Sequence, residues 1–399
     1  MKEKHPMQAM VYRRYGGPEV LRLETVAEPT PGPNDVLVQV HAASLNAADV
    51  YLLKGEPAML RLSAGLREPK RPILGVDIAG KVVALGSHVT QFQPGDAVYG
   101  DLSGCGCGGF AEYVCARADA LALKPDGLTF AQAASVPLAA VTALQGLRLA
   151  GPITAGQQVL IHGASGGVGT FALQLAKSFG ATVTAVCSTR NVELARALGA
   201  DYVIDYTQAD FTAGGQRYDL IFVANGNRAL ADYRRAVRRG GCCIVVGGDI
   251  GTIMRATLLG PLLSLGGNTD ASGSPSPSQR DLTFISGLLD SGALVPVVDR
   301  CFPLRELPEA LRYRAAGTHA AKSSSRGKDV AAVPPAATSL PSLGLRDAPD
   351  TSAGGTVAAE TRYAAPIPLG RIGNAVEAAA MYWPERHHDG FNTWPQRLQ

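Results

Sequence analysis

The chain has 399 residues, of which 46% are hydrophobic and 18% charged, a composition typical of a globular protein long enough to form two domains. Its formal net charge is only +3, and no stripe of clustered Lys and Arg indicates a nucleic-acid partner. No apolar run approaches the ~20 residues of a membrane-spanning helix, and an odd number of cysteines favours reduced thiols over a disulfide framework.

The first part of the chain predicts a β-rich domain. Between residues 7 and 125, short runs of alternating apolar and polar residues are separated by Gly, Pro, Asn and Asp, which is typical of strands joined by turns. The runs are AMVYRRYG, LRLETVAEP, DVLVQVHAASL, ILGVDIAGKVVALG and DAVYG. Many short strands ahead of any long helix predict a compact barrel. The N-terminus lacks the apolar core of a signal peptide, so we expect a cytoplasmic protein.

A helical pattern over residues 128–151 leads to a strand, a glycine turn and a further helix. Residues 159–180 read VLIHGASGGVGTFALQLAKSFG, and the helix is expected to begin near Val168. Glycine lets a pyrophosphate approach the backbone, and free N–H groups at a helix start attract negative charge. The turn therefore predicts a dinucleotide phosphate site. The residues expected to line it are Ser165, Gly166, Gly167, Val168 and Gly169.

Strands and helices continue to alternate after this turn, which predicts a doubly wound parallel sheet. Residues 181–188 predict the second strand and residues 193–200 the next helix, followed by the strands DYVIDY and YDLIFVA. In such sheets an acidic residue at the end of the second strand normally accepts hydrogen bonds from the adenosine ribose and selects NAD. Here that strand end reads Cys187, Ser188, Thr189, Arg190 and has no carboxylate.

This strand end predicts NADPH as the cofactor. The hydroxyls of Ser188 and Thr189 and the guanidinium of Arg190 suit a ribose 2′-phosphate. We expect Lys177 to project from the preceding helix toward the same side. The alternative is that Arg190 is a solvated surface charge, because exposed arginines are common.

The remaining strand ends complete the predicted nucleotide fold. Asn225 and Gly226 follow the strand YDLIFVA at the carboxyl edge of the sheet, where ligands of open α/β folds collect. His162, directly before the glycine turn, is interpreted as a strand residue rather than a catalyst. The Ser- and Pro-rich residues 267–279 predict a mobile loop. Residues 281–313 predict a helix, a strand VPVVDR and a helix, so the β-rich domain is expected to receive chain from both ends.

Several segments together resemble the medium-chain dehydrogenase/reductase superfamily, in its quinone oxidoreductase branch related to zeta-crystallin. They are NAADVYLLKG, GVDIAGKVVALGSHVTQFQPGDAVYG, FAEYV, ASVPLAAVTALQGL and HGASGGVGTFALQLAKSFGA, and the resemblance covers about residues 8–314. It implies an α/β fold in which a Rossmann doubly wound parallel sheet joins an N-terminal β-rich GroES-like barrel domain. We expect the barrel in residues 1–130, the Rossmann domain in 131–270, a return to the barrel domain in 271–322, and a disordered linker with an atypical tail in 323–399.

The resemblance also shows which metal ligands the chain lacks. Zinc alcohol dehydrogenases of this superfamily carry a Cys early in the barrel domain and a Gly-His-Glu triplet later. Here Asn46 takes the first position, and the triplet is Gly75, Val76 and Asp77. Valine cannot ligate a metal, so we expect no catalytic zinc. The thiols of Cys105, Cys107 and Cys115 number three where a structural zinc site needs four, so we expect no metal there either.

Without zinc, reduction of a quinone or an activated alkene is the simpler chemistry, since it needs only a hydride donor and a proton source. By resemblance, Asn46 donates its amide to a substrate oxygen or the cofactor, and Tyr51 binds or protonates the reduced oxygen. Asp49 lies between them as a catalytic carboxylate or, alternatively, as a helix-capping one. Thr142 faces the nicotinamide, unless its hydroxyl bonds to the preceding turn. The backbone at residues 247–248 (Gly247 and Gly248) borders the nicotinamide.

The sequence therefore predicts an NADPH-dependent, zinc-independent reductase of quinones or related conjugated carbonyls. An enoyl-thioester or 2-alkenal reductase is the enzymatic alternative, because these activities share one scaffold. A non-catalytic NADPH-binding sensor or scaffold is the alternative from another class. We expect a small-molecule quinone or enone as the partner, no nucleic acid, and a homodimer.

Overall fold

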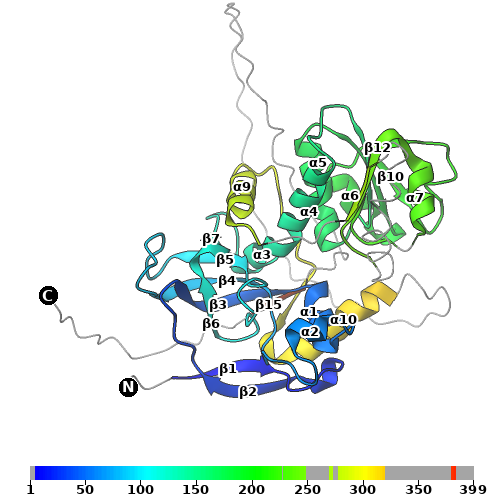
Figure 1. Cartoon of the computed structure of the whole chain (residues 1–399). Helices are drawn as coiled ribbons and strands as arrows, with labels where there is room; N and C mark the ends of the chain where they lie inside the picture. The colour runs from blue at the N-terminus through cyan, green and yellow to red at the C-terminus, as the bar shows by residue number, and fades with distance from the viewer. Residues whose placement is uncertain (1–4, 227, 249–268, 273–276, 320–378, 383–399) are drawn as a thin grey trace, which may run out of the picture.

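The structure, a computed structural model, describes residues 5–226, 228–248, 269–272, 277–319 and 379–382. It has two domains side by side (Figure 1): a β-rich domain that contains the N-terminal strands, and an α/β domain built on a parallel sheet. The α/β class and the barrel-plus-Rossmann architecture predicted from the sequence are confirmed.

The β-rich domain consists of a hairpin and a larger sheet. Within the described residues the larger sheet has seven strands in the order β14-β15-β3-β4-β5-β7, with β6 paired to β3. Each of the five alternating runs predicted as a strand overlaps a strand of this domain, and in β1, β3 and β4 most side chains are buried. The strands of this domain are β1 (Pro6–Val11), β2 (Arg22–Ala27), β3 (Asp35–Leu45), β4 (Asp77–Leu85), β5 (Ala97–Asp101), β6 (Tyr113–Arg117), β7 (Leu121–Leu123), β14 (Arg300–Pro303) and β15 (Ala379–Tyr382).

The α/β domain holds a parallel sheet of six strands within the described residues, in the order β10-β9-β8-β11-β12-β13. Counted from β8, this is the 3-2-1-4-5-6 order of a Rossmann sheet, with its switch point between β8 and β11. The strands are β8 (Gln158–His162), β9 (Thr182–Cys187), β10 (Tyr202–Asp205), β11 (Tyr218–Val223), β12 (Val237–Val245) and β13 (Thr269–Ser272).

Helices cover both faces of the parallel sheet, so its strands read as nearly continuous apolar runs. Ile161 and Phe222 pack with α4 and α5 on one face, and Leu160 and Ile221 pack with Tyr233 of α7 on the other. The α-helices are α1 (Ala47–Lys54), α2 (Leu60–Ala64), α3 (Phe130–Ala134), α4 (Pro137–Leu149), α5 (Gly167–Ser178), α6 (Val192–Ala197), α7 (Leu230–Ala236), α9 (Gln279–Asp290) and α10 (Leu307–His319). Single 3₁₀ turns are η1 (Pro18–Val20), η2 (Ala118–Ala120), η3 (Thr189–Asn191) and η5 (Leu304–Glu306).

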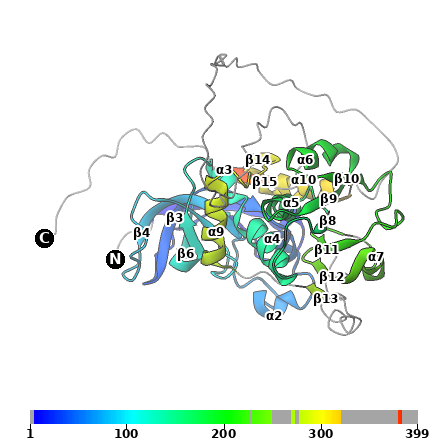
Figure 2. The same ribbon diagram turned by 90° about the horizontal axis from the view of Figure 1, so that it is seen from above.

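Helices α4 and α9 lie between the two sheets (Figure 2). The carboxylate of Asp281 in α9 accepts a hydrogen bond from Gln145 of α4 at 2.9 Å, and the Ser286 hydroxyl lies 2.8 Å from that of Tyr99 in β5. Helix α9 therefore contacts both domains. No helix in the described part of the chain is long and apolar enough to cross a membrane.

The strand predicted over VPVVDR, residues 295–300, is wrong: the strand begins only at Arg300. Upstream of it, the Val295 amide donates to Oε1 of Gln174 at 2.8 Å, and Nε2 of Gln174 donates to the Val295 carbonyl at 3.2 Å. The side-chain amide of Gln174 thus takes both backbone hydrogen bonds of Val295, which a neighbouring strand would otherwise form.

The mobile loop predicted over residues 267–279 is wrong for its central part. Residues 269–272 form β13, which pairs in parallel with β12 from Cys242↔Thr269 to Val245↔Ser272. An open edge of β12 offers unpaired backbone groups, and pairing with β13 satisfies them. Residues 267–268 and 273–276 of the predicted loop lie outside the described residues.

The predicted linker and tail, residues 323–399, lies outside the described residues except for 379–382. These four residues form β15, a strand that the sequence did not predict. It runs antiparallel to β3, with Ala379 opposite Leu45, and parallel to β14, with Ala379 opposite Arg300. The far end of the chain therefore supplies a strand of the barrel sheet.

Candidate active site

The glycine turn after β8 stands at the carboxyl edge of the parallel sheet. Gly163 has a φ of +79°, and a Cβ there would meet the backbone of Asn225 at 2.7 Å. A Cβ on Gly169 would lie 2.0 Å from the Gly163 carbonyl oxygen. Only glycine fits at these two positions, because Gly163 lies against the backbone after β11 and the start of α5 lies against the turn.

This turn leaves backbone donors unpaired. Gly166 donates its amide hydrogen to the Gly163 carbonyl at 3.1 Å, but no described group accepts from the amides of Ser165, Gly167, Val168 and Gly169. Free donors at the N-terminus of a 12-residue helix favour an anion. The residues present therefore fit the pyrophosphate of a dinucleotide, and a side chain at Gly163 or Gly169 would fill its cradle.

The adenosine end of the edge corrects one premise of the sequence analysis. Asp205 ends β10, pairs with Cys187 across the sheet, and accepts a hydrogen bond from the Thr189 hydroxyl at 2.6 Å. A carboxylate is thus present at this edge, but it comes from the neighbouring strand rather than from β9. Because the Thr189 proton is directed at Asp205, Thr189 does not offer it to a phosphate.

Arg190 and Lys177 lie in different places. Arg190 is exposed and forms no hydrogen bond or ion pair with another residue that the structure describes. Lys177 binds the Asp201 carboxylate at 2.8 Å and the Ala181 carbonyl at 3.2 Å. Ala181 precedes β9, and α5 runs antiparallel to the strands, so Lys177 lies at the amino edge. The prediction that Lys177 faces the same side as Arg190 is wrong.

On the barrel side, Asp49 caps α1. Its Oδ2 accepts the Asn46 amide hydrogen at 2.8 Å and its Oδ1 that of Gly75 at 3.1 Å. The side chain is buried, and burial raises the pKa of Asp49 to about 7. Since both oxygens are held by backbone amides, the geometry favours the capping alternative, and the catalytic role predicted for Asp49 has no support in it.

Asn46 begins the same helix, and both hydrogens of its amide point into the barrel domain. Nδ2 donates to the Ser44 hydroxyl at 3.0 Å and to Oδ2 of Asp77 at 2.9 Å. The donation to substrate predicted for Asn46 is therefore wrong in this arrangement. The carbonyl oxygen, an acceptor, faces the backbone amide of Asp49 in the capping box of α1, and its second lone pair can accept from a ligand.

Tyr51 extends from α1 to the Rossmann domain. Its hydroxyl donates to the Gly248 carbonyl at 3.4 Å, and Gly248 bridges to Gly226 beyond the ends of β12 and β11. A Cβ on Gly247 would lie 2.1 Å from the Ala224 carbonyl oxygen, so these two strand ends approach closely. The structure thus brings Tyr51 to the sheet edge where the sequence predicted the nicotinamide.

Two other predicted residues lie near this edge. Asn225 donates its backbone amide hydrogen to the His162 carbonyl at 3.3 Å. Thr142, in the middle of α4, is buried, and its hydroxyl forms no hydrogen bond with a described residue. The alternative in which Thr142 bonds to the preceding turn is therefore not seen.

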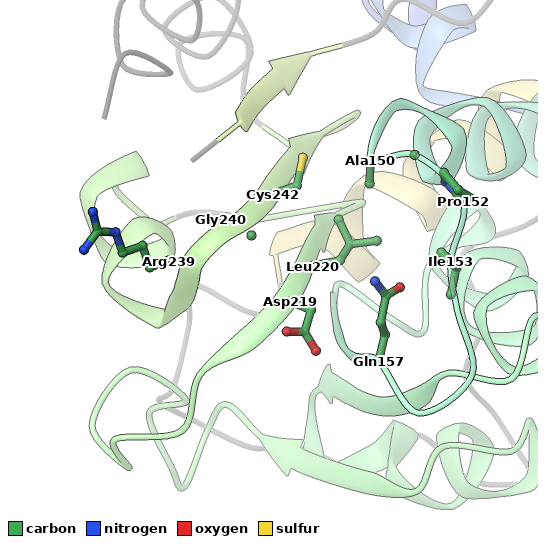
Figure 3. A pocket seen from close by; sticks show the side chains of 11 residues that line it. Ala150, Pro152, Ile153, Gln157, Asp219, Leu220, Arg239, Gly240 and Cys242 are labelled. Atoms are coloured by element: carbon green, nitrogen blue, oxygen red, sulfur yellow. The ribbon is translucent and has the colours of Figure 1, made fainter. Parts of the chain in front are cut away.

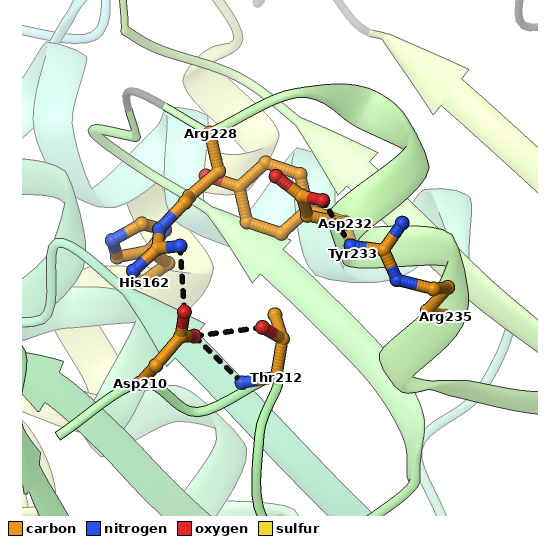
Figure 4. A network of polar contacts seen from close by, with 7 residues as sticks. All are labelled: His162, Asp210, Thr212, Arg228, Asp232, Tyr233 and Arg235. Atoms are coloured by element: carbon orange, nitrogen blue, oxygen red, sulfur yellow. Dashed lines mark hydrogen bonds and ion pairs between the residues drawn. The ribbon is translucent and has the colours of Figure 1, made fainter.

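A polar network that the sequence did not predict lies behind the glycine turn (Figure 4). Nδ1 of His162 lies 2.7 Å from the Tyr233 hydroxyl, and Arg228 pairs with Asp210 at 2.8 Å. Burial, with a smaller effect of Arg228, lowers the pKa of His162 to about 4. His162 is thus a buried, neutral strand residue, as its position in the sequence indicated.

The prediction of no metal site concerned three cysteines and Asp77. The structure places these cysteines in different elements, and Asp77 forms hydrogen bonds within the protein. Cys105 and Cys107 lie in the turn after β5, Cys115 lies in β6 opposite Leu37, and Asp77 binds Asn46. In the described ranges, no group of three or more His, Cys, Asp or Glu side chains is placed to hold a metal ion.

A pocket of about 170 Å³ opens at the opposite edge of the sheet (Figure 3). It is lined by Pro152 and Gln157 before β8, by Asp219 in β11 and by Cys242 in β12. These residues lie at or near the amino ends of the strands, whereas dinucleotides bind at the carboxyl ends. The pocket is therefore separate from the site of the glycine turn and Tyr51.

Family models match both domains. An "alcohol dehydrogenase GroES-like domain" matches residues 32–126, and a "zinc-binding dehydrogenase" domain matches residues 198–323. The first match lies within the β-rich domain, and the second begins within the parallel-sheet domain and extends past α10.

Known proteins match most of the chain. A 2-methylene-furan-3-one reductase of Solanum lycopersicum is 38% identical over 61% of this chain and 63% of its own length. An NADPH-dependent alkenal/one oxidoreductase, chloroplastic, of Arabidopsis thaliana is 34% identical over 77% of this chain and 76% of its own. The structure of the quinone oxidoreductase from Coxiella burnetii superposes with a TM-score of 0.70 at 32% identity, covering 78% of this chain and 96% of that one. The chain is an oxidoreductase of the medium-chain dehydrogenase/reductase superfamily, and it belongs to the zinc-independent, quinone oxidoreductase-like branch.

Proposed function

We propose that this protein is an NADPH-dependent, zinc-independent reductase that transfers a hydride to quinones or related conjugated carbonyls. The proposal rests on one juxtaposition: the unpaired amides of the glycine turn and the Tyr51 hydroxyl belong to the same carboxyl edge of the parallel sheet. The first can hold a pyrophosphate, and the second can serve the reacting end of the same cofactor.

The chain's own residues orient the cofactor and donate a hydrogen bond to the substrate oxygen. When bound, NADPH supplies the hydride. The amides of Ser165 and Gly167 would hold the pyrophosphate, and Thr142 and the backbone at Gly248 would lie beside the nicotinamide. Tyr51 would exchange the Gly248 carbonyl for the substrate oxygen and donate a hydrogen bond to it as that oxygen gains negative charge.

Arg190 supports NADPH over NADH. Its guanidinium is exposed and has no described partner, so it is available to a 2′-phosphate beside Ser188. Asp205 acts against this choice, because its carboxylate repels a phosphate and can accept from a ribose hydroxyl. We infer that Arg190 prevails, since hydrogen bonds from Thr189, Thr207 and Gln208 already occupy the oxygens of Asp205.

A 2-alkenal or enoyl-thioester reductase is the second candidate. The Arabidopsis relative, which matches three quarters of each chain, is named for alkenals and enones rather than for quinones. The same turn and the same tyrosine would serve both activities, because in each a hydride adds to a conjugated system and oxygen gains charge. The cytoplasmic location and the homodimer stay predictions.

The test is oxidation of NADPH and of NADH by the purified, chelator-treated protein with quinones, 2-alkenals and enoyl thioesters as acceptors. We expect turnover with NADPH, and the acceptor class with the highest kcat/KM identifies the substrate. Tight NADPH binding without turnover of any acceptor would contradict the reductase and favour a sensor or scaffold.

A further inference from the structure

A buried carboxylate links Asn46, at the start of the helix that carries Tyr51, to the start of the helix that carries Thr142. Asp77 is the first residue of β4 and is 0% exposed. Its Oδ2 accepts hydrogen bonds from Nδ2 of Asn46 at 2.9 Å and from the Ser44 hydroxyl at 3.1 Å. Its Oδ1 accepts from the backbone amide of Leu138 at 3.1 Å. One side chain thus joins the barrel strands, the start of α1 and the start of α4.

These contacts determine the orientation of the Asn46 amide. Oδ2 of Asp77 has no proton to donate in its ionised form, so only the NH₂ end of Asn46 can face it. The second amide hydrogen goes to Ser44 at 3.0 Å. If the Asp77 carboxylate were lost, only the backbone amide of Asp49 in the capping box would oppose a 180° turn of the Asn46 amide, which would exchange its acceptor for a donor.

The same carboxylate holds the first turn of α4. Leu138 is the second residue of this 13-residue helix, and Thr142 follows it by four residues, on the same face. The unpaired amides of a helix N-terminus attract a carboxylate, so Asp77 suits this place. The positions of Asn46 and of Thr142 therefore depend on one anchor.

Retaining a carboxylate here is unfavourable by itself. Burial and the Asp101 carboxyl, which pairs with Asp77 in the register of β4 and β5, raise the pKa of Asp77. Three hydrogen-bond donors directed at its two oxygens oppose that effect. A hydrophobic side chain would fill the barrel at a lower desolvation cost, so packing alone does not account for an acid at this position.

We propose that Asp77 is a positioning residue for hydride transfer: it fixes the amide orientation of Asn46 and ties Asn46 to the α4 turn that precedes Thr142, without touching cofactor or substrate. The proposal rests on the proposed reductase function.

The decisive variant is Asp77→Asn, which keeps the shape of the side chain but replaces one acceptor oxygen by a donor. The new NH₂ group must face either Asn46 and Ser44 or the Leu138 amide. Because a donor cannot accept a hydrogen bond, contact on that side is lost. We expect kcat to fall by roughly tenfold or more, as small misplacements of reacting groups do, while the Kd of NADPH changes less than about threefold. The isotope effect with NADPH deuterated at the transferred position should rise, because hydride transfer becomes slower than product release.

A double-mutant cycle shows whether Asp77 acts through Asn46. If it does, Asp77→Asn costs far less activity in an Asn46→Ala background than in the wild type. Equal costs in both backgrounds, or an unchanged kcat and isotope effect, would overturn the proposal. Asp119→Asn, which removes an exposed ion pair with Arg117 in the same domain, is the matched control and should leave all of these quantities unchanged.

A measurement that needs no turnover separates this proposal from the reductase assignment. In wild-type protein labelled with ¹⁵N-asparagine, the side-chain NH₂ protons of Asn46 should exchange slowly with water. Exchange should be faster in Asp77→Asn, and also in Ser44→Ala, a variant that keeps the charge of Asp77. Unchanged exchange in both folded variants would refute the positioning role, whatever acceptor the wild type reduces. Slow exchange in a protein that reduces no acceptor would refute only the reductase.

Discussion

The hydroxyl of Tyr51 lies 3.4 Å from the carbonyl oxygen of Gly248, so helix α1 of the barrel meets the end of β12 in the Rossmann domain. This contact is long for a hydrogen bond that a phenol donates to a carbonyl, and the hydroxyl can therefore exchange it for a better acceptor at small cost. A substrate oxygen that gains charge beside the nicotinamide is such an acceptor.

The first prediction concerns this hydroxyl. Tyr51→Phe should lower kcat for the preferred acceptor by roughly a hundredfold, the lower end of what a positioned proton donor contributes. NADPH affinity, measured by fluorescence titration, should change little. Tyr202→Phe removes a phenol that is 62% exposed and serves as the control. An undiminished kcat in Tyr51→Phe would exclude the proposed role.

The second prediction concerns cofactor choice. Arg190→Ala should raise the KM for NADPH by roughly tenfold to a hundredfold, the worth of a hydrogen bond to a charged group, and leave the KM for NADH nearly unchanged. Steady-state kinetics with both cofactors measures the ratio. Equal effects on the two would show that Arg190 does not bind the 2′-phosphate.

Asp205→Asn is the counterpart of that variant. Removing the charge beside Thr189 should lower the KM for NADPH, opposite to the effect of Arg190→Ala, and leave the KM for NADH nearly unchanged, because Thr189, Thr207 and Gln208 already occupy the Asp205 oxygens. The pair thus distinguishes a specific phosphate contact from a general loss of the site, which would weaken both cofactors in both variants.

The third prediction is a pH dependence of stability. The pKa of His162 is about 4 in the folded chain and ordinarily 6.5. Between these values the unfolded chain binds more protons, so the contribution of His162 is complete above pH 6.5 and is lost as the pH falls toward 4. The loss should reach about 2 kcal/mol at pH 5, measured by denaturant titration.

His162→Gln isolates this effect, because glutamine can still bind Tyr233 but does not titrate. Asp49, with a pKa of about 7, works in the opposite direction, since a raised carboxyl pKa stabilises the folded chain as the pH falls. Asp49 is present in both proteins, so it cancels in the difference between them. Parallel stability curves for the two proteins from pH 7 to 5 would contradict the assignment.

The fourth prediction concerns metal. Val76 stands where zinc members of the superfamily have a histidine, and Asn46 binds Asp77 and Ser44. Dialysis against a chelator should therefore leave kcat and the melting temperature unchanged. Loss of activity after dialysis, restored by Zn²⁺, would show a metal site that these residues do not suggest.

The fifth prediction concerns β15. This strand has neighbours on both sides, so its backbone N–H groups face β3 or β14. Met381→Pro removes one N–H from this ladder and should lower the melting temperature of the barrel, whereas Met381→Leu should not. Equal melting temperatures for the two variants would show that β15 contributes little to the sheet.

The sequence predicted those parts of the fold and the site that are formed by contacts between residues close together in the chain. The glycine turn is one such part, because the strand, the turn and the helix start are formed by consecutive residues, 158–169, that contact one another. The position of Tyr51 could be predicted only through the resemblance, since nothing in its neighbours indicates Gly248, 197 positions away.

Other features depend on contacts between distant segments. Asp205 is near Thr189 because β10 lies beside β9, and the motif at the end of a single strand does not report its neighbour's carboxylate. Lys177 was misplaced because side-chain chemistry was considered without the direction of α5. Asp77 was noticed only as part of an altered triplet, although an acid that begins an apolar strand is a signal in its own right.

The strand β15 has a consequence for how the polypeptide acquires its form during synthesis. The described strands of the Rossmann sheet all come from residues 158–272, so they can assemble once that stretch has left the ribosome. The barrel sheet, whose first strands emerge much earlier, must wait for residues 379–382 before residues 42–45 of β3, a strand already paired with β4, gain a second neighbour. The domain made first is thus completed last, and until then residues 42–45 of β3 form an open edge that can pair with other chains.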